Sequence, residues 1–253
     1  MKKWKIFVIN LAESTERLDA FARQFASLDQ EFEKVEAVPG GGLSEDEAGQ
    51  YYHFEQSDYY KELNLGEIGC YLSHFKVWQM IIEQELDYAI VLEDDVLLNE
   101  HFLPTLDKLQ TLDMPWDIIK LAEFPIKRKV VREISHDDAS LVVYNKVPKG
   151  TYAQVISASG AKKLFSEKGQ KQAYCIQRPI DIDIQYWWEK DLEVYGLKPY
   201  SVEIDNSHPS EIDEKALRQR AKKSFWRQVH SRFYFLFKNK KELKKRLQKL
   251  DSK

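Results

Sequence analysis

The chain has 253 residues, of which 43% are hydrophobic and 13% aromatic, so a sizeable core is expected and wholesale disorder is excluded. Its two cysteines, Cys70 and Cys175, lie far apart in sequence. They exclude a disulfide framework and a metal finger, and they indicate two reduced, buried thiols. The net charge of −3 conceals an asymmetry, because residues 215–253 hold 15 Lys or Arg against two acidic residues.

The first part of the chain predicts a strand, a helix and a second strand. Residues 4–10 (WKIFVIN) are rich in β-branched and aromatic side chains, which favours a strand. Residues 11–28 then carry apolar side chains at helical spacing, and Ser14 can cap the start of that helix. The apolar run 6–9 is shorter than a signal-peptide core or a membrane span requires, which predicts a cytoplasmic protein.

Strands and helices continue to alternate through residue 205. Within 65–84 a mostly buried helix is expected after a turn at Gly66–Gly69, and the most apolar strand of the chain follows at 88–95. This alternation predicts an α/β sandwich around a mostly parallel central sheet. The other expected strands cover 32–38, 116–122, 150–157 and 192–205, a hairpin lies within 125–149, and the other expected helices cover 101–112, 158–169 and 179–191.

Three adjacent carboxylates, Glu93, Asp94 and Asp95, end the most apolar strand. Ligands of α/β sheets bind at the carboxyl ends of strands, and neighbouring carboxylates repel each other unless a cation offsets them. Mg²⁺ and Mn²⁺ prefer oxygen ligands and often combine carboxylates with substrate phosphates. The cluster therefore predicts a divalent cation that bridges to a diphosphate, and the alternative is a solvated acidic turn.

Several segments in fixed order resemble glycosyltransferase family 25, which contains lipooligosaccharide galactosyltransferases of Gram-negative bacteria and relatives that modify collagen. The resemblance covers about residues 5–210, and only the set of segments is specific. It implies a GT-A type nucleotide-sugar fold, a UDP-sugar donor, Mn²⁺ or Mg²⁺, and inversion at the anomeric carbon. The segments are FVINLAESTERLDAF (7–21), LGEIGCYLSHFKVWQ (65–79), VLEDDV (91–96), GTYAQVISASGAKKL (150–164) and PIDIDI (179–184).

The resemblance implies that Glu93-Asp94-Asp95 replaces the Asp-x-Asp motif of that fold. Asp95 is then the first metal ligand and Asp94 the second, while Glu93 or Asp94 reaches the donor ribose. The family pattern has Asp where this chain has the longer Glu93, which weakens its case as a direct ligand. By analogy with GT-A folds, His208 is a further metal ligand.

The same resemblance implies donor contacts from three other segments. Each member also has an ordinary structural alternative: Ser14 as a helix cap, Arg17 in a salt bridge, and His74 as a core histidine. The implied donor-binding residues are Asn10, Leu11, Ser14 and Arg17 after the first strand, Glu67, Gly69 and His74 in the helix near residue 70, and Gln154.

An inverting transfer needs a base beside the reaction centre, and a carboxylate suits this role. Asp183 is the first candidate, Asp181 the second, and Glu123 after the 116–122 strand is a rival. Alternatively, the two aspartates only stabilise the N-terminus of the helix that follows Pro179, where negative charge is favourable.

The chain is predicted to divide into a catalytic domain, residues 1–213, and a basic amphipathic helical tail, residues 214–253. Aromatic residues interleaved with cations predict contact with the anionic surface of the inner membrane, on its cytoplasmic face. A helix docked on the catalytic domain is the alternative, and nucleic acid is not expected as a partner because the tail has no reader motif.

The sequence therefore predicts a metal-dependent, inverting transfer of a hexose, galactose first, from a UDP-sugar to a terminal sugar of lipooligosaccharide. The alternatives are a UDP-glucose or UDP-N-acetylhexosamine transferase of the same fold, and a non-catalytic binding protein on the membrane surface. A nucleotidyltransferase is disfavoured because no glycine-rich phosphate loop follows the first strand.

Overall fold

A computed structural model describes residues 2–123, 127–165, 175–205 and 223–252. The helices are α1 (Thr15–Phe25), α2 (Glu45–Gly49), α3 (Leu65–Glu83), α4 (Phe102–Thr111), α5 (Ala158–Phe165), α6 (Ile180–Gln185) and α8 (Phe225–Asp251), with short 3-10 turns η1 (Gly40–Gly42), η2 (Phe54–Gln56) and η3 (Trp187–Glu189). The strands are β1 (Trp4–Asn10), β2 (Glu33–Glu36), β3 (Tyr88–Glu93), β4 (Val96–Leu98), β5 (Ile118–Lys120), β6 (Val130–His136), β7 (Ala139–Tyr144), β8 (Ala153–Ser157), β9 (Val194–Lys198) and β10 (Val202–Ile204).

An eight-stranded sheet forms the centre of the molecule, in the order β2-β1-β3-β8-β5-β9-β7-β6, and β4 pairs with β10 beside it. The predicted α/β sandwich is confirmed, but the sheet is mixed rather than mostly parallel. Strands β7 and β8 run against the other six, so β8 is antiparallel to both β3 and β5. Local apolar patterns predict that strands exist, but they do not fix strand direction.

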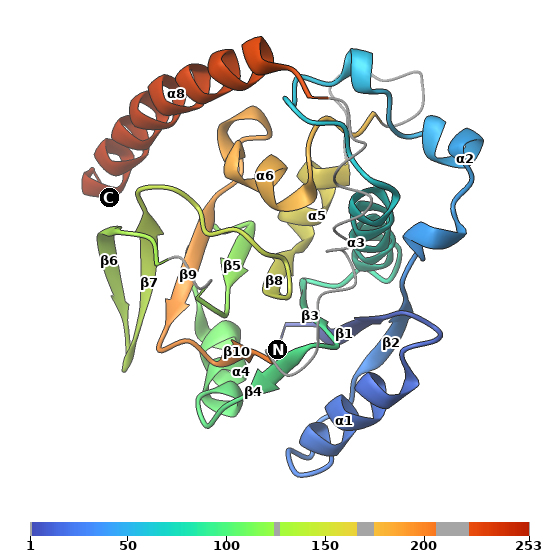
Figure 1. Cartoon of the computed structure of the whole chain (residues 1–253). Helices are drawn as coiled ribbons and strands as arrows, with labels where there is room; N and C mark the ends of the chain where they lie inside the picture. The colour runs from blue at the N-terminus through green and yellow to red at the C-terminus, as the bar shows by residue number, and fades with distance from the viewer. Residues whose placement is uncertain (1, 124–126, 166–174, 206–222, 253) are drawn as a thin grey trace.

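Helices cover both faces of this sheet, with α3, α5 and α6 on one side and α1 and α4 on the other (Figure 1). Because both faces are covered, β3 is apolar at nearly every position, and Tyr88–Leu92 are all buried. Side chains alternate between the faces. Val91 lies in the core under α3, Leu92 lies in the opposite core, and Glu93 therefore points to the α3 side.

Helix α3 begins earlier than the sequence predicts. Asn64 caps it through a reciprocal pair with Glu67, so Gly66 and Gly69 lie in the first helical turns instead of forming a separate turn. The loop before the helix packs closely on these glycines. A Cβ on Gly69 would lie 2.5 Å from the Val38 carbonyl oxygen, and a Cβ on Gly40 would lie 2.5 Å from Gly66 Cα. The glycines thus permit backbone contact between loop and helix.

We expect Gly69→Ala to lower the free energy of unfolding by about 1–3 kcal/mol, because the added methyl group would push against the backbone of residues 38–40. Gly41→Ala is the matched control, since nothing lies within 4 Å of a Cβ at that position. Urea denaturation followed by circular dichroism measures both variants. Equal stability of the two would contradict a close loop–helix contact.

Helix α8 lies along one side of the rest of the chain (Figure 1). Leu243, Leu247 and Leu250 pack onto the core that contains α1 and α4. Arg246 is buried, donates to the Val194 carbonyl oxygen at 2.9 Å and pairs with Glu193 at 3.1 Å. The predicted boundary between residues 213 and 214 lies outside the described residues.

Candidate active site

A cavity of about 550 Å³ opens at the carboxyl ends of β1 and β3. The start of α1, the loop 37–42 and the start of α3 form its other walls. This is where ligands bind in open α/β sheets, and the volume suits a small-molecule substrate. Its lining residues are Ile9, Asn10, Leu11, Glu13, Arg17, Ala37, Val38, Pro39, Gly40, Gly41, Gly42, Asn64, Leu65, Gly66, Cys70, Ser73, His74, Glu93, Asp94 and Asp95.

Asp94 is held by two neighbours from the first strand and helix. One carboxylate oxygen accepts a hydrogen bond from Asn10 Nδ2 at 2.6 Å, and the other pairs with Arg17 Nη2 at 2.5 Å. Asn10 also donates to the Ser14 carbonyl oxygen at 2.9 Å, which joins the start of α1 to the same group. Both oxygens of Asp94 are thus engaged within the protein.

Asp95 is less fully engaged than Asp94. Its Oδ2 lies 3.5 Å from Arg17, while its buried Oδ1 has no hydrogen-bond partner among the described residues. Burial and the neighbouring charge of Glu93 raise the pKa of Asp95 to about 7 against the opposing effect of Arg17. A buried carboxylate oxygen without a partner, beside two further carboxylates, fits a divalent cation that prefers oxygen ligands.

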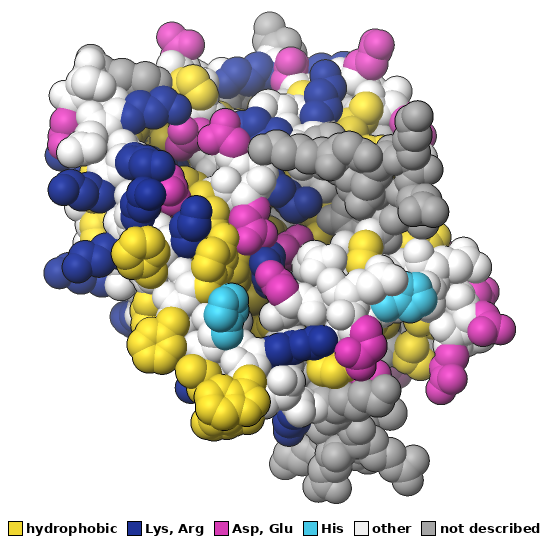
Figure 2. Space-filling view, turned by 90° about the horizontal axis from the view of Figure 1, so that it is seen from above, with side chains coloured by type: hydrophobic (Ala, Val, Ile, Leu, Met, Phe, Trp, Pro, Cys, Tyr) yellow, Lys and Arg dark blue, Asp and Glu magenta, His cyan; other side chains and the backbone are white. Residues whose placement is uncertain are grey.

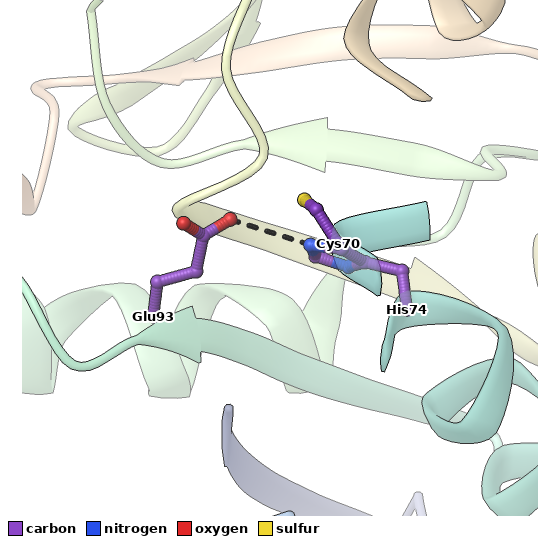
Figure 3. A group of neighbouring side chains, drawn as sticks. All are labelled: Cys70, His74 and Glu93. Atoms are coloured by element: carbon purple, nitrogen blue, oxygen red, sulfur yellow. Dashed lines mark hydrogen bonds and ion pairs between the residues drawn. The ribbon is translucent and has the colours of Figure 1, made fainter. Parts of the chain in front are cut away.

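Glu93 belongs to a second group, with His74 and Cys70 from one face of α3 (Figure 3). His74 Nε2 lies 3.3 Å from Glu93 Oε1, and Thr151 Oγ1 donates to the same oxygen at 2.8 Å. Although burial opposes the charge, these hydrogen bonds lower the pKa of Glu93. The pKa of Cys70 is raised by burial, so its sulfur is a thiol.

The Cys70, His74 and Glu93 ligand atoms lie within 4.8 Å of one another. These three residues could hold a softer divalent ion than Mg²⁺, because they combine sulfur, nitrogen and oxygen ligands. The pocket therefore has two sets of side chains that could bind a cation. The carboxylates around Asp95 offer oxygen ligands alone, whereas Cys70, His74 and Glu93 offer sulfur, nitrogen and oxygen.

A buried lysine lies on the same sheet face as Glu93, behind the pocket. Lys120 Nζ donates to the Gly150 carbonyl oxygen at 2.7 Å and to Gln154 Oε1 at 3.0 Å. Burial lowers the pKa of Lys120 to about 8, against the opposing effect of Asp181 and Glu93. Gln154, predicted to contact the donor, lies in β8, is fully buried and does not line the cavity.

The two aspartates of α6 have different surroundings. Asp183 accepts a hydrogen bond from Tyr71 Oη at 2.7 Å and pairs with the buried Arg178 at 3.0 Å, so both of its oxygens are engaged. Asp181 contributes to the electrostatics of the site: burial raises the pKa of Cys70 and the charge of Asp181 adds to that shift, whereas burial lowers the pKa of Lys120 and the charge of Asp181 opposes it. Asp181 thus interacts electrostatically with Cys70 of the pocket lining and with Lys120.

The remaining predicted residues lie outside the cavity lining. Glu67 completes the cap of α3 and pairs with Lys61 at 3.3 Å, Ser14 takes the N-cap position of α1, and Gly69 supports the loop 37–42 from behind. Glu123 follows β5 and has Lys127 at 3.9 Å. The predicted ligand His208 lies outside the described residues.

Sequence reasoning missed several lining residues, among them Glu13, Asn64, Cys70 and the loop 37–42. One signal was present, because Cys70 and His74 are four residues apart and therefore share a helix face. The loop had no such signal, since its contact with α3 depends on how the two segments meet in space.

A pocket at the strand ends of an α/β sheet, lined by a carboxylate cluster, is typical of proteins that bind a small charged ligand. The chain belongs to glycosyltransferase family 25: the family model described as glycosyltransferase family 25 (LPS biosynthesis protein) matches residues 3–182. That range includes the pocket, Glu93-Asp94-Asp95 and Asp181. The family predicted from the sequence is thereby confirmed.

Animal proteins of this family are among the relatives. The chain is 33% identical over 216 residues to mouse procollagen galactosyltransferase 2 and 27% identical over 214 residues to the human protein, covering 77% of this chain and 34% of each relative. It is 26% identical over 216 residues to a bovine protein named probable inactive glycosyltransferase 25 family member 3, covering 77% of this chain and 36% of that protein. The chain spans about a third of the length of these relatives.

Solved structures are only distantly similar. The crystal structure of A197 from STIV aligns with a TM-score of 0.41 and 15% identity, covering 82% of this chain and 96% of that one. A glycosyltransferase involved in glycosylation of the major capsid of PBCV-1 aligns with a TM-score of 0.36 and 12% identity, covering 64% and 63%. These values carry no argument about function.

Proposed function

We propose that the chain is a metal-dependent, inverting glycosyltransferase that moves galactose from UDP-galactose to a terminal sugar of lipooligosaccharide at the cytoplasmic face of the inner membrane. The observation that carries this proposal is the buried, unpartnered Oδ1 of Asp95 in a strand-end pocket of a family 25 chain. The names of the procollagen galactosyltransferases support galactose as the sugar.

The residues of the pocket divide the work of donor binding. Asp95 would hold the cation, with Asp94 kept in place by Asn10 and Arg17. When bound, Mn²⁺ or Mg²⁺ supplies positive charge against the departing diphosphate. The cavity wall around Leu11 and the loop 37–42 would enclose the nucleotide, which positions the sugar for attack.

The base of the reaction is assigned to Asp181 in this proposal. Its carboxylate would take the proton of the acceptor hydroxyl while that oxygen bonds to the anomeric carbon, and the bond to the diphosphate breaks with its electron pair on UDP. Asp183, the first candidate from the sequence, is already engaged by Arg178 and Tyr71. Asp183 therefore positions α6.

We expect Asp181→Asn to lower kcat by about two to four orders of magnitude while the free energy of unfolding stays within about 0.5 kcal/mol of wild type. Asp183→Asn is the matched comparison, since the same change there weakens the pair with Arg178 and lowers stability. Steady-state kinetics and urea denaturation on both variants separate the roles. If Asp183→Asn loses transfer at full stability while Asp181→Asn remains active, the assignment is reversed.

A donor screen tests the function itself. The protein is incubated with radiolabelled UDP-galactose, UDP-glucose or UDP-N-acetylhexosamines, with Mn²⁺ or with EDTA, and with a panel of oligosaccharide acceptors. The expected result is cation-dependent incorporation from UDP-galactose in preference to the other donors. Preferential incorporation from UDP-glucose or a UDP-N-acetylhexosamine would replace galactose, and full activity in EDTA would remove the cation.

A non-catalytic binding protein is the second candidate, because some relatives carry the name inactive. In this case the pocket would bind a UDP-sugar but would catalyse no transfer. UDP binding measured by calorimetry, together with neither transfer nor hydrolysis of any UDP-sugar in the screen, would favour it over the transferase.

A further inference from the structure

Helix α8 has two unlike faces. The docked face contains Phe235 and Arg246, both 6% exposed, and Phe235 packs against the rings of Tyr186 and Trp188. The opposite face holds large apolar side chains in water, since Trp226 is 78%, Phe233 71% and Phe237 70% exposed. The helix therefore uses only part of its apolar surface to pack on the rest of the chain.

The exposed apolar residues form one stripe. Positions 226, 233 and 237 recur at helical spacing, and Phe225 and Leu236 flank them at 68% and 67% exposed. We call this set the aromatic stripe: Phe225, Trp226, Phe233, Leu236 and Phe237. A contiguous exposed apolar surface of this kind marks an interaction site, because exposing apolar side chains to water is unfavourable and soluble proteins rarely do so over a large patch.

Cations continue and border the stripe. Lys240 and Lys244 extend the same helix face toward the C-terminus, and Arg232 and Lys241 lie beside it, all exposed. Residues 223–241 contain no Asp or Glu. Figure 2 looks onto this side of the molecule and shows hydrophobic side chains gathered with Lys and Arg side chains along one edge. The surface is thus both apolar and positively charged.

From this arrangement we infer that the aromatic stripe of α8 binds the surface of an anionic lipid bilayer, with the rings in the interfacial region and the cations at the headgroups. Trp and Phe beside Lys and Arg suit that boundary, where apolar and charged layers meet. A second copy of the chain is a poorer occupant, because a symmetric contact would bring the same cations together. No helix among the described residues is long and apolar enough to cross a membrane.

Binding along the aromatic stripe would bring the bilayer close to the part of the chain that leads into the pocket wall. The first turn of α8 is tied to residues 54–61, because Arg227 donates to the Phe54 carbonyl oxygen at 2.8 Å and Ser224 N donates to the Tyr60 carbonyl oxygen at 2.8 Å. That segment leads directly into Asn64–Gly66 of the pocket wall. A lipid-linked acceptor would then reach the pocket from the bilayer in which it is anchored. This consequence alone rests on the proposed function.

The test is co-sedimentation of the full chain with phosphatidylcholine vesicles, with and without phosphatidylglycerol. We expect binding only to the anionic vesicles, with an affinity that falls as salt is added. The triple variant Trp226→Ser, Phe233→Ser, Phe237→Ser should lose about tenfold or more of that affinity. Leu97→Ser with Leu103→Ser is the matched control, since these half-exposed residues lie on β4 and α4, and its binding should equal wild type.

Three results would overturn the inference. The triple variant could bind anionic vesicles as wild type does, the wild type could bind neutral vesicles equally well, or the triple substitution could abolish a dimer or binding to duplex DNA while vesicle binding stays unchanged. Transfer to a short water-soluble acceptor, measured in parallel, should be the same in the triple variant and wild type. Failure of membrane binding is therefore separable from failure of the transferase assignment.

Discussion

Asp95→Asn is expected to reduce sugar transfer by about two to three orders of magnitude and to abolish cation-dependent binding of UDP. The asparagine keeps the shape of the side chain and removes the charge that would hold the cation. Stability should be equal or higher, because burial and Glu93 already disfavour the Asp95 carboxylate and raise its pKa to about 7. Kinetics with Mn²⁺, calorimetry with UDP and urea denaturation measure the three effects.

Two further variants sharpen this experiment. Glu100→Gln removes a carboxylate that is 87% exposed and should change nothing. Cys70→Ser distinguishes the two groups that could bind a cation, and we expect it to lower Mn²⁺ affinity by less than about threefold, since Mn²⁺ prefers oxygen ligands. A large loss of Mn²⁺ affinity in Cys70→Ser, with Asp95→Asn still binding the ion, would move the cation to the Cys70–His74–Glu93 group.

The strand that ends in the carboxylates shows what local sequence can predict. Tyr88–Leu92 read as a buried strand because every position is apolar, and the three acids after it could only lie at its carboxyl end. The family resemblance, rather than local pattern, pointed to Asn10 and Arg17, and both line the same pocket as Asp95. Neighbouring parallel strands make this possible, since β1 and β3 end at one edge of the sheet.

The roles of Gln154 and Asp183 depend on partners that are not visible in local sequence. Asp183 lies two residues from Asp181 in the same PIDID segment. Only the fold shows that Tyr71, 112 residues away in sequence, donates a hydrogen bond to one of its oxygens. Gln154 lies two strands from β1 in the sheet, where Lys120 of β5 reaches it from the neighbouring strand. The split of α8 into a docked and an exposed face likewise depends on Glu193 and Tyr186, which no helical periodicity can identify.

Arg178→Met is expected to lower the free energy of unfolding by about 3–5 kcal/mol, because it leaves the nearly buried carboxylate of Asp183 without its counter-charge and also removes the pairs with the more exposed Glu189 and Asp58. Arg178 is 3% exposed and pairs with Asp183 at 3.0 Å, with Glu189 at 2.8 Å and with Asp58. Its guanidinium also lies 3.7 Å from the centre of the Tyr186 ring. Urea denaturation at neutral pH measures the loss, and Arg132→Met is the control, since its pair with Asp251 is exposed and should be worth less than about 1 kcal/mol.

The pH dependence of Arg178→Met gives a second test of the same contact. Burial already raises the pKa of Glu189 against the opposing effect of Arg178, so removing the arginine should raise it further. A carboxyl whose pKa is higher in the folded state than in the unfolded state costs stability above its folded pKa, and this cost disappears as protonation proceeds. The deficit of Arg178→Met should therefore shrink as the pH falls toward and below the raised folded-state pKa of Glu189. A deficit that is constant across pH would instead indicate lost packing on Tyr186, and Arg178→Lys, which keeps the charge without the planar contact, would then be as unstable as Arg178→Met.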